Sequence, residues 1–117
     1  MKLRIQDDSL RFRLTRTEVE ALGSGQAVER TVHFREGRIL RYIVAPEAGA
    51  ASPRAAFGAD AIRVALPAAR LSAWAASDEV GIEGNDGPLR ILVEKDFQCL
   101  HRDNAAEPDA FPNPQSS

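Results

Sequence analysis

The sequence predicts an α+β fold, mainly β, in which one strand-strand-helix-strand-strand unit occurs twice. Residues 10–32 and 62–84 can be laid over each other without a gap, 52 positions apart, which aligns Val28 with Val80. Apolar and polar residues alternate with a period of two through most of the expected strands. Because neither half has enough apolar surface to close a core alone, we expect the halves to pair about a pseudo-twofold axis as one small barrel or as packed sheets.

Alternation defines the strands of the first copy. Residues 2–5 and 10–14 alternate, and the Asp-Asp-Ser of residues 7–9 supplies the side-chain-to-backbone hydrogen bonds of a hairpin turn. Residues 27–34 and 39–44 are rich in β-branched side chains and are separated by a short turn that contains glycine. We expect these two segments to form a second hairpin.

A short helix is expected between the two hairpins of each copy. Thr15, with Glu18 three residues on, forms a capping box, and the glycines of residues 23–25 end the first helix. In the second copy Pro67 takes the place of Thr15, since its fixed φ and missing amide are tolerated at a helix start. Trp74 falls on the face of this second helix that we expect to enter the core.

The second copy keeps the same order of elements. Its strands are expected at residues 55–57, 62–66, 80–84 and 89–94. Asn-Asp-Gly at residues 85–87 is a strong hairpin signal. We therefore expect a single domain over residues 1–100, with repeats at about 1–45 and 53–96, followed by an irregular tail at 101–117 that is rich in Asp, Asn, Ala and Pro.

The composition is that of an ordinary globular protein, with 44% apolar and 27% charged residues. No apolar run approaches the roughly 20 residues of a membrane-spanning helix. Residues 1–5 alternate and lack the apolar stretch of a signal peptide. Cys99 is the only cysteine, which excludes an internal disulfide and is typical of a reducing compartment. We therefore expect a cytoplasmic protein that does not contact a membrane.

The net charge is −2 and is unevenly distributed. Residues 1–45 hold nine Lys or Arg against six Asp or Glu, whereas residues 46–117 hold six against eleven. This asymmetry suits an anionic partner for the first half, or contact between the halves. The overall negative charge disfavours nucleic acid as the partner.

The order of elements over residues 10–45 and 62–94, with a short helix that begins just after a strand ending in Leu-Thr or Leu-Pro, resembles the swapped-hairpin barrel of AbrB-like bacterial transition-state regulators. Those regulators usually supply one such unit per chain and pair two chains. The resemblance implies that one chain here holds both units, and it implies a DNA-binding regulator.

Four segments together are similar to a family of short, uncharacterised bacterial proteins. They are MKLRI at residues 1–5, LTRTEV at 14–19, VEKDFQCL at 93–100 and FPNP at 111–114. The resemblance spans nearly the whole chain and implies a bacterial origin, but it carries no assigned activity.

Arginines provide the first candidate site, because a pseudo-twofold axis would bring two related pairs around one anion-sized spot. The pairs are Arg11 with Arg63 and Arg41 with Arg90. Neighbours that would extend them into a basic outer face for phosphate groups are Arg4, Arg13 and Arg30. In the alternative interpretation the arginines are merely the polar positions of half-buried strands, paired with Glu29, Glu83 and Glu94.

The second candidate site is C-terminal. Cys99 and His101, followed by Asp103, offer donor atoms that zinc accepts, although the spacing differs from that of a common zinc finger. In the alternative, Cys99 is a small buried residue beyond the last strand and the acids belong to a solvated tail. Further along, Phe111 with Pro112 and Pro114 would fold back over the domain or dock on another protein.

No catalytic set assembles in the sequence. There is no G-x-S-x-G elbow, no P-loop and no dinucleotide-binding glycine pattern. The sequence therefore favours a non-enzymatic domain that binds another protein or itself, with no cofactor. Two alternatives stay open, an AbrB-like DNA-binding regulator and a metal-binding protein.

Overall fold

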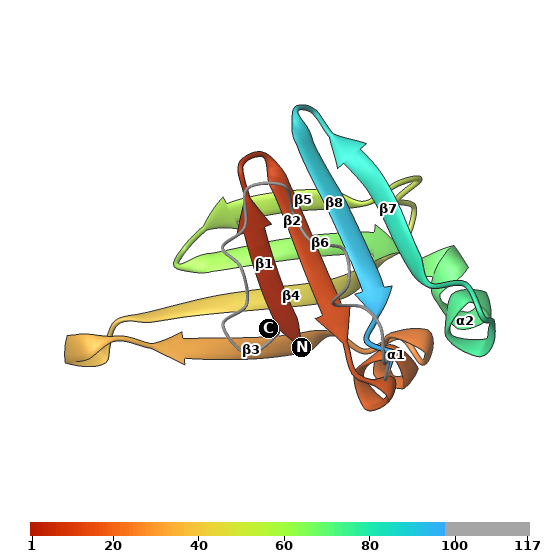
Figure 1. Cartoon of the computed structure of the whole chain (residues 1–117), viewed down its shortest axis with the longest axis horizontal. Coiled ribbons are helices and arrows are strands. Elements are labelled where there is room, and N and C mark those ends of the chain that lie inside the picture. The colour runs from red at the N-terminus through yellow and green to blue at the C-terminus, as the bar shows by residue number, and fades with distance from the viewer. Residues whose placement is uncertain (98–117) are drawn as a thin grey trace, which may run out of the picture.

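The structure, a computed structural model, describes residues 1–97 as two four-stranded sheets and two short helices (Figure 1). The elements follow the predicted order, hairpin, helix, hairpin, twice over. They are β1 (Lys2–Gln6), β2 (Ser9–Leu14), α1 (Arg16–Gly23), β3 (Val28–His33), a 3₁₀ turn η1 (Arg35–Gly37), β4 (Ile39–Glu47), β5 (Arg54–Gly58), β6 (Ala61–Pro67), α2 (Ala68–Ala76), β7 (Gly81–Asp86) and β8 (Leu89–Lys95).

Each sheet combines one hairpin from each half of the chain. We call the sheet with strand order β1-β2-β8-β7 sheet A, and the sheet with order β3-β4-β6-β5 sheet B. The central pair of each sheet is parallel, β2 with β8 and β4 with β6, whereas the outer pairs are antiparallel hairpins. The two halves therefore exchange hairpins, and neither half completes a sheet by itself.

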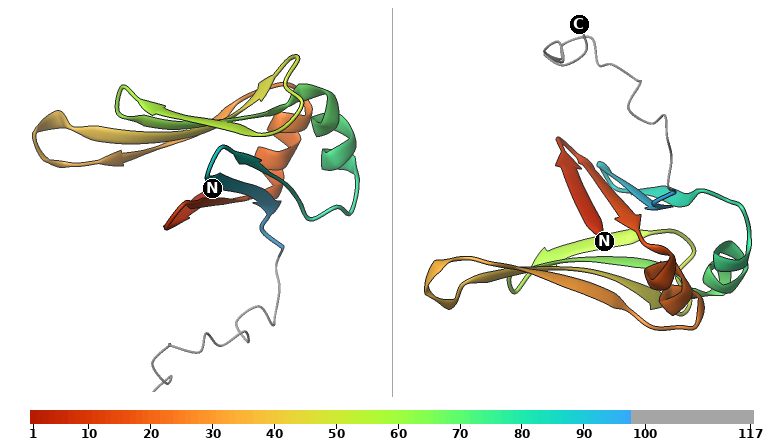
Figure 2. Two further views of the ribbon diagram at one scale, coloured as in Figure 1. Left: turned by 90° about the horizontal axis from the view of Figure 1, so that it is seen from above. Right: turned by 60° about the horizontal axis from the view of Figure 1, so that its bottom comes forward.

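The sheets stack as two crossed layers and do not form a barrel. Among residues 1–97 no backbone ladder joins sheet A to sheet B, so the expectation of a small barrel is wrong and that of packed sheets is right. The physical reason lies in the connections. Both helices carry the chain from one sheet to the other at the same end of the molecule, and the β3–β4 hairpin extends well beyond sheet A at the opposite end (Figure 2).

The two sheets share one register. Arg41 N donates to the Asp60 carbonyl at 2.9 Å, and the same bond recurs from Arg90 N to Asp8 at 2.8 Å. The gapless alignment fails only at β7. In sheet B, Val28 pairs with Val44, and the equivalent pair in sheet A is Ile82 with Val93. Ile82 is buried and Val80 is exposed, so Ile82 takes the predicted place of Val80. The shared order and register agree with a duplicated unit, and the duplication itself stays a prediction.

The core lies between the inner faces of the sheets and beneath the helices. It is formed by Leu10, Phe12, Leu14, Val19, Leu22, Val28, Val44, Val64, Leu66, Leu71, Trp74, Ile82, Ile91 and Val93. The predicted capping box at Thr15 and Glu18 begins α1. The two helices lie so close together that a Cβ atom on Gly23 would be 2.7 Å from the Cβ of Ala75. No helix in the described range is long and apolar enough to cross a membrane.

A buried carboxylate ties the start of the chain to both sheets. One oxygen of Glu18 accepts the Thr15 amide at 2.8 Å, and the other contacts the Met1 ammonium at 3.0 Å and the Arg30 guanidinium. Burial alone would raise the pKa of Glu18. The Thr15 hydrogen bond and the two cations outweigh burial, so the pKa lies below its ordinary value.

Candidate anion-binding face

Five basic side chains stand on the outer face of sheet A, and we call this surface the basic face. They are Lys2, Arg4, Arg11, Arg13 and Arg90. In β2 the arginines alternate with buried apolar residues and therefore point away from the core. The ladder places Arg4 opposite Arg11 and Lys2 opposite Arg13, while the parallel pairing places Arg90 opposite Ser9. Neighbours on three adjacent strands thus share one surface.

Carboxylates neutralise part of this charge. Oε1 of Glu94 accepts hydrogen bonds from Arg11 Nε at 2.8 Å and Arg13 Nε at 2.9 Å. Glu83 accepts one from Arg90 at 2.9 Å. Because a single carboxylate serves two guanidinium groups, the Glu94 cluster keeps a net positive charge. At the edge of the face, Asp96 lies 3.9 Å from Lys2.

A shallow hollow of about 220 Å³ opens in the middle of the basic face. Its lining comes from β1, β2 and β8, and consists of Arg4, Gln6, Ser9, Arg11, Arg90 and Leu92. Three guanidinium groups, a hydroxyl and an amide can all donate hydrogen bonds, which suits a phosphate or carboxylate group. Arg11 and Arg90 each use one N–H group in an ion pair, with Glu94 and Glu83, and retain further N–H donors.

The equivalent surface of sheet B is not basic to the same degree. By register, the positions of Arg4, Arg13 and Glu94 are occupied there by alanines, and those of Gln6 and Ser9 by small residues. In the same order these residues are Ala56, Ala65, Ala45, Gly58 and Ala61. At the other three basic positions sheet B also carries arginine, with Arg54, Arg63 and Arg41 in the places of Lys2, Arg11 and Arg90. The fold therefore tolerates small side chains at the first set of positions, where sheet A adds two cations, Arg4 and Arg13, and one carboxylate, Glu94.

The structure separates the arginine pairs predicted from the repeat. Arg11 and Arg90 lie on the outer face of sheet A, whereas Arg63 and Arg41 lie on the outer face of sheet B, so the four do not surround one spot. Hairpin exchange is the cause, because it places equivalent strands in different sheets. Arg30 is also absent from the basic face, since it pairs with Glu18.

The predicted ion pairs with Glu29, Glu83 and Glu94 are confirmed. In addition to those on sheet A, Arg41 lies 3.4 Å from Glu29 on sheet B, the position equivalent to Arg90 with Glu83. The arginines thus do take the structural role of the alternative interpretation. That role does not exclude a ligand, because the Arg41–Glu29 and Arg90–Glu83 pairs are exposed and open at low cost, although Glu94, which holds Arg11 and Arg13, is buried.

Sequence reasoning did not find Lys2, Gln6 and Ser9 as members of the site. The alternation of residues 2–5 marks Lys2 as an exposed strand residue. What makes it a neighbour of Arg13 is the β1–β2 register. Gln6 and Ser9 gave no such signal, because both adjoin the turn at Asp7 and Asp8, where polar residues are expected simply to form the turn.

The C-terminal candidates Cys99, His101, Asp103, Phe111, Pro112 and Pro114 lie outside the described residues. The zinc and docking hypotheses based on them therefore stay predictions. Within residues 1–97, no group of three or more His, Cys, Asp and Glu side chains is arranged to hold a metal ion.

Comparison with known proteins places the chain by family only. A family model described as "Family of unknown function (DUF7009)" matches residues 1–115. No curated protein matches the chain, and no solved structure matches it.

Proposed function

We propose that this chain, which belongs to the DUF7009 family of unknown function, is a non-enzymatic binding domain whose basic face holds phosphate groups of a partner. The observation that carries the proposal is the contrast between the two sheets. Sheet B keeps the same register with alanine or glycine where sheet A has Arg4, Arg13 and Gln6. Arg4, Arg13 and Gln6 are thus additions to the pattern of residues that the two sheets share.

The charge distribution supports the same conclusion. Residues 1–97 hold fourteen basic and fourteen acidic side chains, and the negative excess comes from residues 98–117. The net acidity that disfavoured nucleic acid is therefore not a property of the two sheets. A segregated patch of cations on a neutral domain can still attract a phosphate-rich partner at moderate ionic strength.

Fluorescence anisotropy with a labelled duplex DNA and with labelled inorganic polyphosphate tests the proposal. The site variant is Arg4→Gln/Arg90→Gln, since both side chains are exposed and line the hollow. The matched control is Arg41→Gln/Arg63→Gln, which removes the same charge from sheet B. If about three phosphates are contacted, the affinity of the unmodified protein for DNA should fall with salt with a log–log slope of about −3.

The two probes distinguish the sources of phosphate. Loss of binding to both probes in the sheet A variant alone supports a general phosphate site. Loss of DNA binding, with polyphosphate bound equally weakly by all variants, assigns the site to nucleic acid. Equal losses in the sheet A and sheet B variants, or no binding at low salt, would refute the proposal.

An AbrB-like DNA-binding regulator is a second candidate, and the exchange of hairpins between the two halves supports it. It requires preference for a particular duplex sequence, whereas a general phosphate site gives equal affinity for unrelated duplexes. Competition between two duplexes of the same length and different sequence separates these candidates. The bacterial origin and the cytoplasmic location inferred from the sequence stay predictions.

A further inference from the structure

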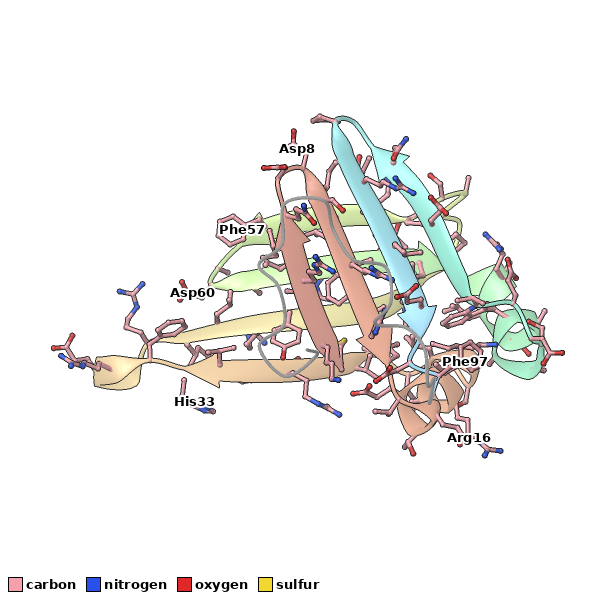
Figure 3. All side chains as sticks on the ribbon, viewed as in Figure 1. Asp8, Arg16, His33, Phe57, Asp60 and Phe97 are labelled. Atoms are coloured by element: carbon pink, nitrogen blue, oxygen red, sulfur yellow. The ribbon has the colours of Figure 1, made fainter. Side chains whose placement is uncertain are left out.

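An apolar hollow remains open at the edge of the core, away from the basic face. Its volume is about 280 Å³. It lies between the two sheets and is lined by Leu10, Ala55, Ala56, Phe57, Ile62 and Leu89. Phe57 is 79% exposed, whereas the core residues Phe12 and Trp74 are almost fully buried. Figure 3 shows Phe57 standing free of the ribbon on the side opposite to the helices. The hollow is thus an apolar surface that the rest of residues 1–97 leaves uncovered.

Acidic hairpin turns adjoin this hollow. Asp7 and Asp8 form the turn that precedes Leu10, and Asp60 lies in the turn that precedes Ile62. Figure 3 shows Asp8 and Asp60 at the ends of their hairpins, on either side of Phe57. A partner for this hollow should therefore carry an apolar group flanked by cations.

The β3–β4 hairpin of the same chain has that chemistry at its tip. Phe34 is 59% exposed and is followed by Arg35, Glu36 and Arg38, so the tip carries one net positive charge. Two backbone hydrogen bonds fix the tip, from Phe34 N to the Arg38 carbonyl at 2.8 Å and from Arg38 N to the Arg35 carbonyl at 3.1 Å. The hairpin reaches past the edge of sheet A, where nothing in residues 1–97 covers it (Figures 1 and 2).

We propose that two copies of this chain associate by inserting the Phe34 tip of each into the Phe57 hollow of the other. Tip and hollow lie on the same side of the molecule, so a twofold axis lets both contacts form at once. Arg35 and Arg38 then face the aspartates of the partner copy's turns. This surface is distinct from the basic face, which stays accessible in the pair.

The full chain is tested by size-exclusion chromatography with light scattering over a concentration series. Phe34→Ser and Phe57→Ser each remove one side of the contact, and both change exposed side chains that the core does not need. Val80→Ser is the matched control, because Val80 is 52% exposed and belongs to neither surface. Near-ultraviolet circular dichroism of buried Trp74 verifies that each variant is folded.

The unmodified protein and Val80→Ser should form a concentration-dependent dimer, and each phenylalanine variant should be monomeric. A mixture of Phe34→Ser and Phe57→Ser should recover association, since one intact tip then meets one intact hollow. A monomer at every concentration overturns the proposal. So does a dimer that survives both substitutions, or a mixture that stays monomeric.

Discussion

Lys95 Nζ lies 2.9 Å from the carbonyl oxygen of Trp74 and 5.2 Å from the centroid of its indole ring. The same ammonium donates to the Ser77 carbonyl at 2.6 Å. One cation from the last strand therefore satisfies two carbonyls at the end of α2, where the helix dipole is negative, and contacts the face of a buried aromatic ring. This contact fastens α2 to sheet A.

Replacing Lys95 with methionine should lower the free energy of unfolding by about 1–2 kcal/mol, because the carbonyls lose a charged donor and the ring loses its cation. Chemical denaturation followed by Trp74 fluorescence measures the change. Lys2→Met is the control, since Lys2 is 79% exposed and should have almost no effect. Equal stability of the two variants would contradict the assigned role.

Acid should destabilise the protein through Glu18. Its pKa in the folded state is below the ordinary value, so between these two values the unfolded chain binds a proton that the folded chain does not. The stabilisation is present above the ordinary glutamate pKa and is lost as the pH falls through the folded-state pKa. Urea titrations from neutral pH down through this window should show stability falling, with a smaller slope in Glu18→Gln.

The same substitution tests the buried ion pairs at neutral pH. Glu18→Gln leaves the Met1 ammonium and Arg30 without their carboxylate, which should cost about 2–3 kcal/mol since Arg30 is half exposed. Glu20→Gln on the same helix changes an exposed carboxylate and should be nearly neutral. A loss shared equally by both variants would show that general charge, and not the buried pairs, matters.

Gly23 allows the two helices to touch. Gly23→Ala brings a Cβ within 2.7 Å of the Cβ of Ala75, so packing strain should outweigh the gain in helix propensity and cost about 1–2 kcal/mol. Adding Ala75→Gly removes the clash, and the double variant should be more stable than the sum of the single effects predicts. Thermal denaturation of the unmodified protein, the two single variants and the double variant gives the coupling free energy between the two sites. Strict additivity would show that the helices separate without cost.

Glu94 limits the charge of the basic face, and Glu94→Gln should raise affinity for labelled duplex DNA. Removing one negative charge about 6 Å from a phosphate in water is worth ~0.7 kcal/mol, or about threefold at low salt. Stability should fall at the same time, because Arg11 and Arg13 lose a shared acceptor. Weaker DNA binding by a folded Glu94→Gln protein would mean that Glu94 positions the arginines more than it neutralises them.

Local signals predicted most of the elements. The capping box at Thr15 and the helix end at Gly23 to Gly25 depend only on neighbours in sequence, and both occur as expected. The shift at β7 could not be seen, because Val80 and Ile82 are both apolar and two residues apart, so either choice keeps the alternation. Only the ladder with β8 distinguishes them.

The site depended on pairing that alternation does not encode. A period of two tells which face Arg11 occupies, but not that Arg90 comes from the far end of the chain to lie beside that strand. The choice between a barrel and two packed sheets was open for the same reason, since alternation shows which face a residue occupies but not which strands pair. The sequence could predict that charged side chains lie on the outer face of a strand, but not which residues of distant strands would share the basic face.

Because Ser9 pairs with Arg90, the β1–β2 hairpin cannot join sheet A until the β7–β8 hairpin has been synthesised. During synthesis, sheet B can assemble once β6 has left the ribosome, but β1 and β2 find their partner only after β8 emerges. The nascent chain must therefore carry the apolar side of β2 without its partner strand until β8 has been made, and during this time β2 is open to chaperones and to aggregation. Such distant contacts also place refolding of the full chain on a scale of about milliseconds to seconds.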